Sequence, residues 1–135
     1  FKESYFTISK KNVIRGIHYQ NTRGCAKFIF VLMGKIIDVV IDLRKNSKSY
    51  KKIFHIELSE NKNKSIYIPA GCAHAFFTLK NNSIIHYYCS NSYAPKFEKG
   101  IKYNDKFFNF KWPKKPTIVS NKDLNHKDFE IFDAL

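Results

Sequence analysis

The sequence predicts an all-β domain, built as a sandwich or a barrel. Runs rich in β-branched and aromatic residues dominate the chain, and short stretches of Gly, Asn, Ser and Lys separate them. Apolar residues at helical spacing are scarce. No segment of about 20–50 residues repeats, which excludes solenoids and propellers. The chain of 135 residues is long enough for one domain, residues 1–135, with a core of its own.

Six runs are expected to form strands, at residues 27–33, 35–43, 51–58, 65–68, 73–79 and 84–90. The segment 12–20 is expected to form a further strand. Gly34 predicts a tight hairpin turn between the first two of the six runs. The polar stretch 61–64 predicts a turn, and Pro-Ala-Gly at 69–71 ends a strand sharply.

Residues of the expected strand at 35–43 alternate between its two faces, and this places the Asp38 carboxylate opposite a row of apolar side chains. Ile37, Val39 and Ile41 fall on one face, and the carboxylates of Asp38 and Asp42 fall on the other. A carboxylate among such neighbours lines a polar cavity or faces solvent at a sheet edge. Solvent is the more common situation.

The C-terminal quarter is less regular. From about residue 107 the strand pattern weakens, and Trp112, Pro113 and Pro116 mark an irregular crossing segment. Ser-Asn-Lys-Asp at 120–123 predicts the cap of a short C-terminal helix.

The formal net charge of +13 favours an anionic partner such as a phosphorylated metabolite, with compositional drift toward Lys and Asn as the alternative. The lysines are scattered, and no clustered basic helix is predicted, so nucleic acid is not the expected partner. The longest apolar stretch, residues 28–41, is too interrupted to span a membrane. No secretory signal is visible. The three cysteines show no C-x-x-C spacing, which predicts reduced thiols in a cytoplasmic protein.

Two histidines fall in motifs that bear on metal binding. Residues 69–74 have the form P-x-G-x-x-H, the spacing by which metal-binding cupins place one histidine, here His74, inside a jelly roll. Those proteins also use an upstream H-x-H, where this chain has His18-Tyr19-Gln20. An amide oxygen at Gln20 is a poor zinc or iron ligand, and the remaining set is incomplete. We therefore expect no metal and an imidazole free to act as a general base, since histidine titrates near neutral pH.

Taken singly, the other candidate residues have ordinary explanations. Lys27, at the start of an apolar strand, is typical of a strand-end charge in solvent. Tyr87 in a strand usually packs. Asp123 is by default a carboxylate at a helix N-terminus. Their order along one chain is what makes them informative.

That order resembles a known family. The matching runs are R-G-x-H-x-Q at 15–20, G-K-I-I-D-V-V-I-D-L-R at 34–44, I-P-x-G-x-A-H at 68–74, Y-A-P at 93–95, W-P at 112–113 and S-N-K-D at 120–123. Together they resemble the dTDP-4-dehydrorhamnose 3,5-epimerases over nearly the whole chain. The resemblance implies a cupin-type jelly-roll barrel with a short C-terminal helical segment, acting as a homodimer without a cofactor.

The implied reaction inverts C3, C5 or both in a nucleotide-diphospho-4-keto-6-deoxyhexose. By default this is dTDP-4-dehydro-6-deoxyglucose, on the way to rhamnose for a surface polysaccharide. Carried over by position, His18 is the base, Asp123 its carboxylate partner, Tyr87 the acid on the opposite sugar face, and Lys27 the cation near the keto oxygen. Four further substrate-binding residues are implied: Arg15, Gln20, His74 and Asp38.

The chain also departs from the family pattern. It begins after the strands that carry an R-G-x-F-x-E segment, so we expect either a fragment or a chain that lacks part of the nucleotide site. Glu3-Ser4-Tyr5 stands where the family usually has Q-D-N, Cys25 stands near a common Gln, and Ser92 replaces a common Tyr. The identity of the nucleotide is therefore left open.

Three alternatives stay open beside the epimerase. A cupin isomerase that moves the keto group between C4 and C3 needs a base on one face only. A non-catalytic or truncated cupin would only bind a sugar nucleotide. A metal-dependent cupin oxygenase would hold a metal ion in stoichiometric amount.

Overall fold

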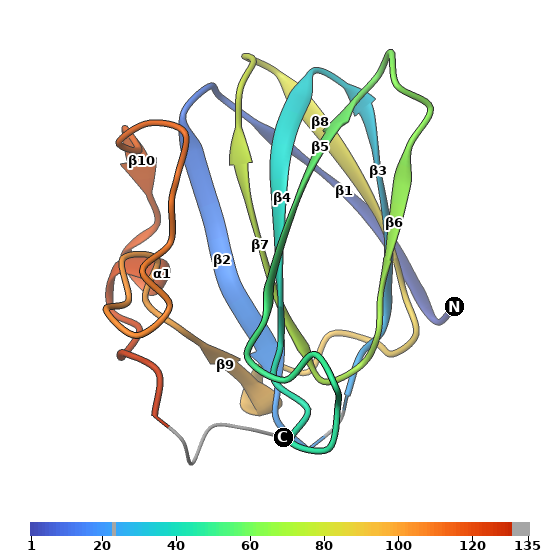
Figure 1. Ribbon diagram of the computed structural model, residues 1–135. Helices are drawn as coiled ribbons and strands as arrows, with labels where there is room; N and C mark the ends of the chain where they lie inside the picture. The colour runs from blue at the N-terminus through green and yellow to red at the C-terminus, as the bar shows by residue number, and fades with distance from the viewer. Residues whose placement is uncertain (23, 131–135) are drawn as a thin grey trace.

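The computed structural model describes residues 1–22 and 24–130 as two β-sheets that face each other, with one short helix (Figure 1). The jelly-roll strands are β1 (Glu3–Ser9), β2 (Val13–Gln20), β3 (Lys27–Met33), β4 (Lys35–Asp42), β5 (Ile53–Ser59), β6 (Ser65–Ile68), β7 (Cys72–Thr78) and β8 (Ser83–Cys89). The C-terminal elements are a 3-10 turn (Pro95–Phe97), β9 (Glu98–Gly100), β10 (Ile118–Val119) and α1 (Asn121–Leu124). The all-β prediction is confirmed, and β2 to β8 lie where strands were expected.

The order of the strands gives the jelly roll. One sheet has the order β1-β8-β3-β6, and the other has β10-β2-β7-β4-β5, with β9 also paired to β2. From β1 to β8 the chain changes sheet at every connection except β4 to β5. The hairpin predicted at Gly34 is therefore wrong, because β3 and β4 belong to different sheets. A short turn between two apolar runs does not reveal whether the chain folds back or crosses over.

The core fills the space between the sheets. On β8, Ile85, Tyr87 and Cys89 are buried while their neighbours are only partly buried, as expected for a strand with one face inward. Ile29 of β3 and Phe76 of β7 are buried in the same cluster, so the two sheets share this apolar layer. Burying each such side chain stabilises the fold by about 1.5–3 kcal/mol.

The C-terminal segment lies along the outer edge of the second sheet. In Figure 1, β9, β10 and α1 all lie on the same side of β2, and both short strands pair with β2. The predicted cap is confirmed, because Ser120 Oγ accepts a hydrogen bond from the Asp123 N–H at 3.1 Å. Among the described residues, no helix has the length and apolar character to cross a membrane.

Candidate active site

Strand β2 is irregular where it carries the R-G-x-H motif. Its pairing with β7 shifts register between Arg15 and His18, and Gly16 has φ +122°. A Cβ at residue 16 would collide with Ala75 and the β7 backbone, so this position requires glycine. Bulges of this kind re-aim side chains and free backbone groups. Here the Gly16 N–H donates to Asp123 Oδ2 at 3.2 Å.

His18 and Asp123 form a hydrogen-bonded pair, although 105 residues separate them. His18 Nε2 lies 2.6 Å from Asp123 Oδ1. The imidazole is 26% exposed and the carboxylate 3%. Burial alone would raise the pKa of Asp123, but the bonds from His18 and Gly16 hold it below its usual value. Asp123 is therefore ionised at neutral pH, and it fixes the tautomer of the imidazole.

A second carboxylate faces the other ring nitrogen. His18 Nδ1 lies 3.6 Å from Glu98 Oε1. Glu98 in turn accepts hydrogen bonds from Lys122 Nζ at 2.5 Å and from the Tyr93 hydroxyl at 2.9 Å. Burial opposes ionisation of Glu98, yet Lys122 and His18 keep its pKa below the usual value. Since Nε2 is bonded to Asp123, Nδ1 is the nitrogen left to take a proton.

A second imidazole completes the surroundings of Asp123. His126 Nε2 lies 3.4 Å from Asp123 Oδ1, and its ring meets the edge of the His18 ring at a centroid distance of 5.5 Å. Burial and the nearby charge of His18 lower the pKa of His126. His126 is therefore neutral at neutral pH.

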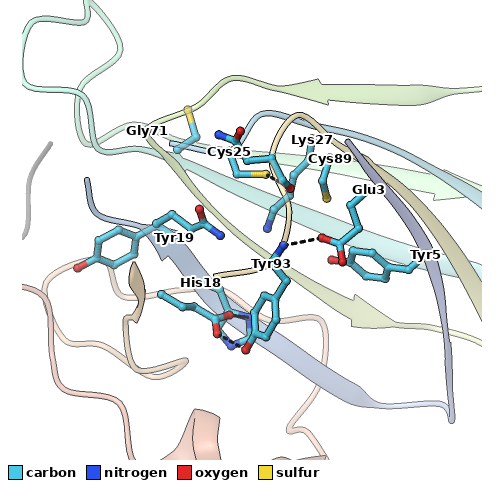
Figure 2. Close-up of a pocket in the computed structure, with 13 residues that line it drawn as sticks. Glu3, Tyr5, His18, Tyr19, Cys25, Lys27, Gly71, Cys89 and Tyr93 are labelled. Atoms are coloured by element: carbon cyan, nitrogen blue, oxygen red, sulfur yellow. Dashed lines mark hydrogen bonds and ion pairs between the residues drawn. The ribbon is translucent and has the colours of Figure 1, made fainter. Parts of the chain in front are cut away.

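His18 opens into a cavity of about 360 Å³, within the size range of small-molecule sites. Figure 2 shows Tyr5, Lys27 and Tyr93 gathered around the same space. The cavity is lined by Glu3, Tyr5, His18, Tyr19, Gln20, Cys25, Lys27, Gly71, Cys72, Cys89, Asn91, Tyr93 and Glu98.

Two more of the predicted residues line this cavity. Lys27 begins β3, and it is the one cation among the described lining residues. Its side chain borders the cavity and its residue is partly buried, so the default expectation of a solvated strand end is wrong. Gln20 also borders the cavity, and its buried Oε1 has no hydrogen-bond partner within the described part of the chain. Because this oxygen is buried, a ligand reaches it only after the Gln20 side chain moves.

His74 and Asp38 form a buried pair beside the dyad. His74 pairs with His18 across β7 and β2, and its Nε2 lies 2.8 Å from Asp38 Oδ2. Burial lowers the pKa of His74, as do the charges of Lys27 and His18, while Asp38 opposes them. Asp38 is fully buried. The common solvent explanation for this carboxylate is therefore wrong, and Asp38 is not among the residues that line the cavity either.

The predicted acid, Tyr87, lies behind another tyrosine. Its ring is 4% exposed and stacks on Tyr5 at a centroid distance of 4.7 Å and an angle of 13°. Tyr5 lines the cavity, whereas Tyr87 does not. Burial raises the pKa of both phenols above 10, so both keep their protons at neutral pH.

Arg15, like Tyr87, His74, Asp38 and Asp123, does not line the cavity. It is exposed, and its guanidinium donates to Ser9 Oγ at 3.1 Å and to the Ile8 carbonyl at 3.5 Å. In this arrangement it tethers β2 to the end of β1.

Comparison with known proteins places this site in a family. The model of the dTDP-4-dehydrorhamnose 3,5-epimerase family matches residues 1–130. The dTDP-4-dehydrorhamnose 3,5-epimerase of Methanothermobacter thermautotrophicus is 35% identical over 130 residues, which are 94% of this chain and 70% of that protein. The chain belongs to this family.

Solved structures agree with that assignment. The dTDP-4-dehydrorhamnose 3,5-epimerase of Elizabethkingia anophelis has a TM-score of 0.91 and 33% identity, covering 96% of this chain and 72% of that one. The dTDP-6-deoxy-D-glucose-3,5-epimerase of Legionella pneumophila, in complex with dTDP-4-keto-L-rhamnose, has a TM-score of 0.90 and 32% identity, covering 95% and 69%. The cupin-type jelly roll implied by the sequence resemblance is confirmed.

Three residues at positions that depart from the family pattern fall on the cavity wall. Glu3, Tyr5 and Cys25 all line the cavity. Glu3 Oε2 accepts the Tyr93 N–H at 2.8 Å. The neighbouring Cys89 lowers the pKa of Cys25 to about 5, opposed by burial and helped by the charge of Lys27. This epimerase-family cavity thus carries a carboxylate and a thiol pair of its own.

Sequence reasoning missed Tyr5, Tyr93, Glu98 and His126. Tyr93 is the tyrosine of the Y-A-P motif and Glu98 follows that motif closely, which was a usable signal for both. His126 comes three residues after Asp123, a spacing that brings a side chain back toward a residue at a helix end. For Tyr5 the only signal was the departure from the family pattern. That departure marks the position but does not show where the side chain points.

Proposed function

We propose that this chain inverts C3, C5 or both of a nucleotide-diphospho-4-keto-6-deoxyhexose, with dTDP-4-dehydro-6-deoxyglucose as the default substrate. The observation that carries the proposal is the His18–Asp123 pair opening into a cavity that also holds Lys27. A ketone at C4 acidifies the protons on C3 and C5, because the resulting carbanion delocalises as an enolate. His18 Nδ1 removes such a proton, and the carboxylates of Asp123 and Glu98 stabilise the imidazolium that forms.

Lys27 stabilises the enolate oxygen. Its ammonium is fixed at the start of a paired strand and lies on the cavity wall. By analogy with the loss of an oxyanion-hole donor, such a preorganised charge is worth about 3–4 kcal/mol in the transition state. Gln20 Oε1, which lacks a partner in the described structure, accepts a hydrogen bond from a sugar hydroxyl. His74 and Asp38 support the wall behind them.

Inversion requires a proton from the face opposite the base. The base stands on β2 of one sheet, and Tyr87 stands on β8 of the other. A sugar held between the two sheets therefore presents one face to His18 and the other to the tyrosines. Tyr87 is the proposed acid, and the Tyr5 ring has to move aside before the Tyr87 hydroxyl reaches the sugar. Arg15 would bind substrate only after leaving its contacts with β1.

The proposed function is tested by solvent exchange. In D₂O, the chain is expected to introduce deuterium at C3 or C5 of dTDP-4-keto-6-deoxyglucose and to yield an inverted product by NMR. Parallel reactions with CDP- and GDP-linked sugars identify the nucleotide. Transfer of the keto group to C3 would instead indicate the ketoisomerase. If no 4-keto nucleotide sugar shows exchange, the remaining alternative is a non-catalytic cupin that only binds a sugar nucleotide.

We also propose that the active form is a homodimer in the cytoplasm, assembled through the outer face of the β1-β8-β3-β6 sheet. Phe6 and Ile8 of β1 are 62% and 55% exposed on this face. Beside them Phe30 stacks against Tyr88 and neighbours Phe28. The same apolar patch on two copies makes a self-complementary interface of the kind that closes a twofold dimer.

Phe6→Glu is expected to convert the dimer to a monomer, because two carboxylates would be buried at the twofold interface. Light scattering coupled to size-exclusion chromatography measures the change. Phe54→Glu is the matched control, since Phe54 is 54% exposed on the other sheet. A wild-type monomer, or equal behaviour of the two variants, would contradict this interface.

A further inference from the structure

We infer that His18, Asp123 and His126 form a Zn²⁺ site whose occupation switches off the proposed proton transfer. The inhibitory effect rests on the proposed function, whereas the metal site itself rests on geometry alone. One ligand atom from each of the three residues lies within 4.8 Å of the other two. The residues come from β2, from α1 and from the segment after α1.

The distances suit a small tetrahedral ion. With Zn–N and Zn–O bonds of about 2.0–2.2 Å, two ligands of a tetrahedral site lie roughly 3.3–3.5 Å apart. His126 Nε2 and Asp123 Oδ1 already lie 3.4 Å apart. His18 Nε2 lies at 2.6 Å from the same oxygen, so this pair has to separate by about 1 Å to admit the ion. Two imidazoles and one carboxylate, with a fourth position left for water, are a recognised zinc set.

Packing holds the His126 ring in place, and its Nε2 makes no hydrogen bond within the described residues. This nitrogen is buried, and its contact with Asp123 is misaligned. The ring packs against Gly100 of β9 so closely that any Cβ at that position would overlap it. A buried nitrogen lacking a partner costs free energy, and a metal ion would satisfy it.

Glu98 supplies the outer contact that such sites require. A metal-bound histidine normally donates its other N–H to a carboxylate. His18 Nδ1 already faces Glu98 Oε1 at 3.6 Å. Once Nε2 binds the metal, Nδ1 must carry a proton and can no longer accept one from the substrate. Zinc and proton abstraction therefore exclude each other.

The test measures binding directly on the intact chain, by competition between the metal-free protein and a chromophoric zinc chelator. One Zn²⁺ per chain is expected, and His126→Asn should weaken its binding at least tenfold. The matched control is His55→Asn, whose exposed ring lies on β5 away from the cluster, and it should bind as the wild type. Cys25→Ser should also bind normally, which separates this site from the thiol pair.

Activity supplies the second readout. Zn²⁺ should inhibit deuterium exchange by the wild type, while the exchange rate of His126→Asn, compared with its own zinc-free rate, should resist inhibition. Unchanged zinc affinity in His126→Asn, or a thiolate charge-transfer band in the Co²⁺-loaded protein, would overturn the inference. If the chain catalyses no exchange, the binding measurement still decides whether the metal site exists.

Discussion

The His18→Asn variant is expected to lose deuterium exchange at C3 and C5 by roughly 10²–10⁴-fold, the range that a positioned general base contributes. Asparagine keeps a hydrogen bond to Asp123 but has no nitrogen that can take a proton. Because the substrate contacts of Lys27 and Gln20 stay in place, the loss should fall on kcat and leave KM nearly unchanged. Rates are measured by NMR in D₂O.

His55→Asn is the control, because it removes an exposed imidazole far from the cavity. The proposal fails if His18→Asn exchanges as fast as the control. A parallel loss with Asp123→Asn is consistent with the pair acting as a unit, since the analogous substitution in a Ser-His-Asp triad costs about 10⁴-fold.

Tyr87→Phe is expected to separate exchange from inversion. His18 can still remove the proton and return a deuteron from the same face, so label enters the sugar with retained configuration. Formation of the inverted product should fall by roughly 10²–10⁴-fold, because the acid on the opposite face is gone. The burial that keeps the pKa of Tyr87 above its ordinary value also keeps this proton available at neutral pH.

The control for this variant is Tyr5→Phe, which keeps the stacked ring and removes only the hydroxyl. It should still invert the sugar. If Tyr5→Phe loses inversion and Tyr87→Phe does not, then Tyr5, the phenol that lines the cavity, is the acid, and the role assigned to Tyr87 is wrong.

The strands that sequence reasoning located share one property. From β3 to β8 each strand is an apolar run with turn residues on both sides, and such runs can be recognised from the local sequence. Strands β9 and β10 have three and two residues and exist only because β2 offers a partner. Strand β1 was missed because its apolar residues lie largely on the exposed face.

The site shows the same contrast between what a local pattern predicts and what tertiary contacts decide. Motif order singled out His18, Lys27 and Asp123, but a one-dimensional pattern does not show which residues surround an imidazole. Glu98 and His126 reach His18 through the docking of the C-terminal segment on β2. The stacking of Tyr5 over Tyr87 depends on pairing between β1 and β8. Such contacts depend on tertiary structure, so no local spacing predicts them.

The base and its two carboxylate partners lie in different parts of the fold. His18 stands in the barrel, whereas Glu98 and Asp123 stand on the C-terminal segment, which pairs five residues with β2 and buries Ile101, Phe108 and Phe129 against the barrel. We expect this segment to open locally at a lower free energy than the barrel unfolds. Catalytic competence would then vanish first on heating or in denaturant, while the β-sheet signal stays native.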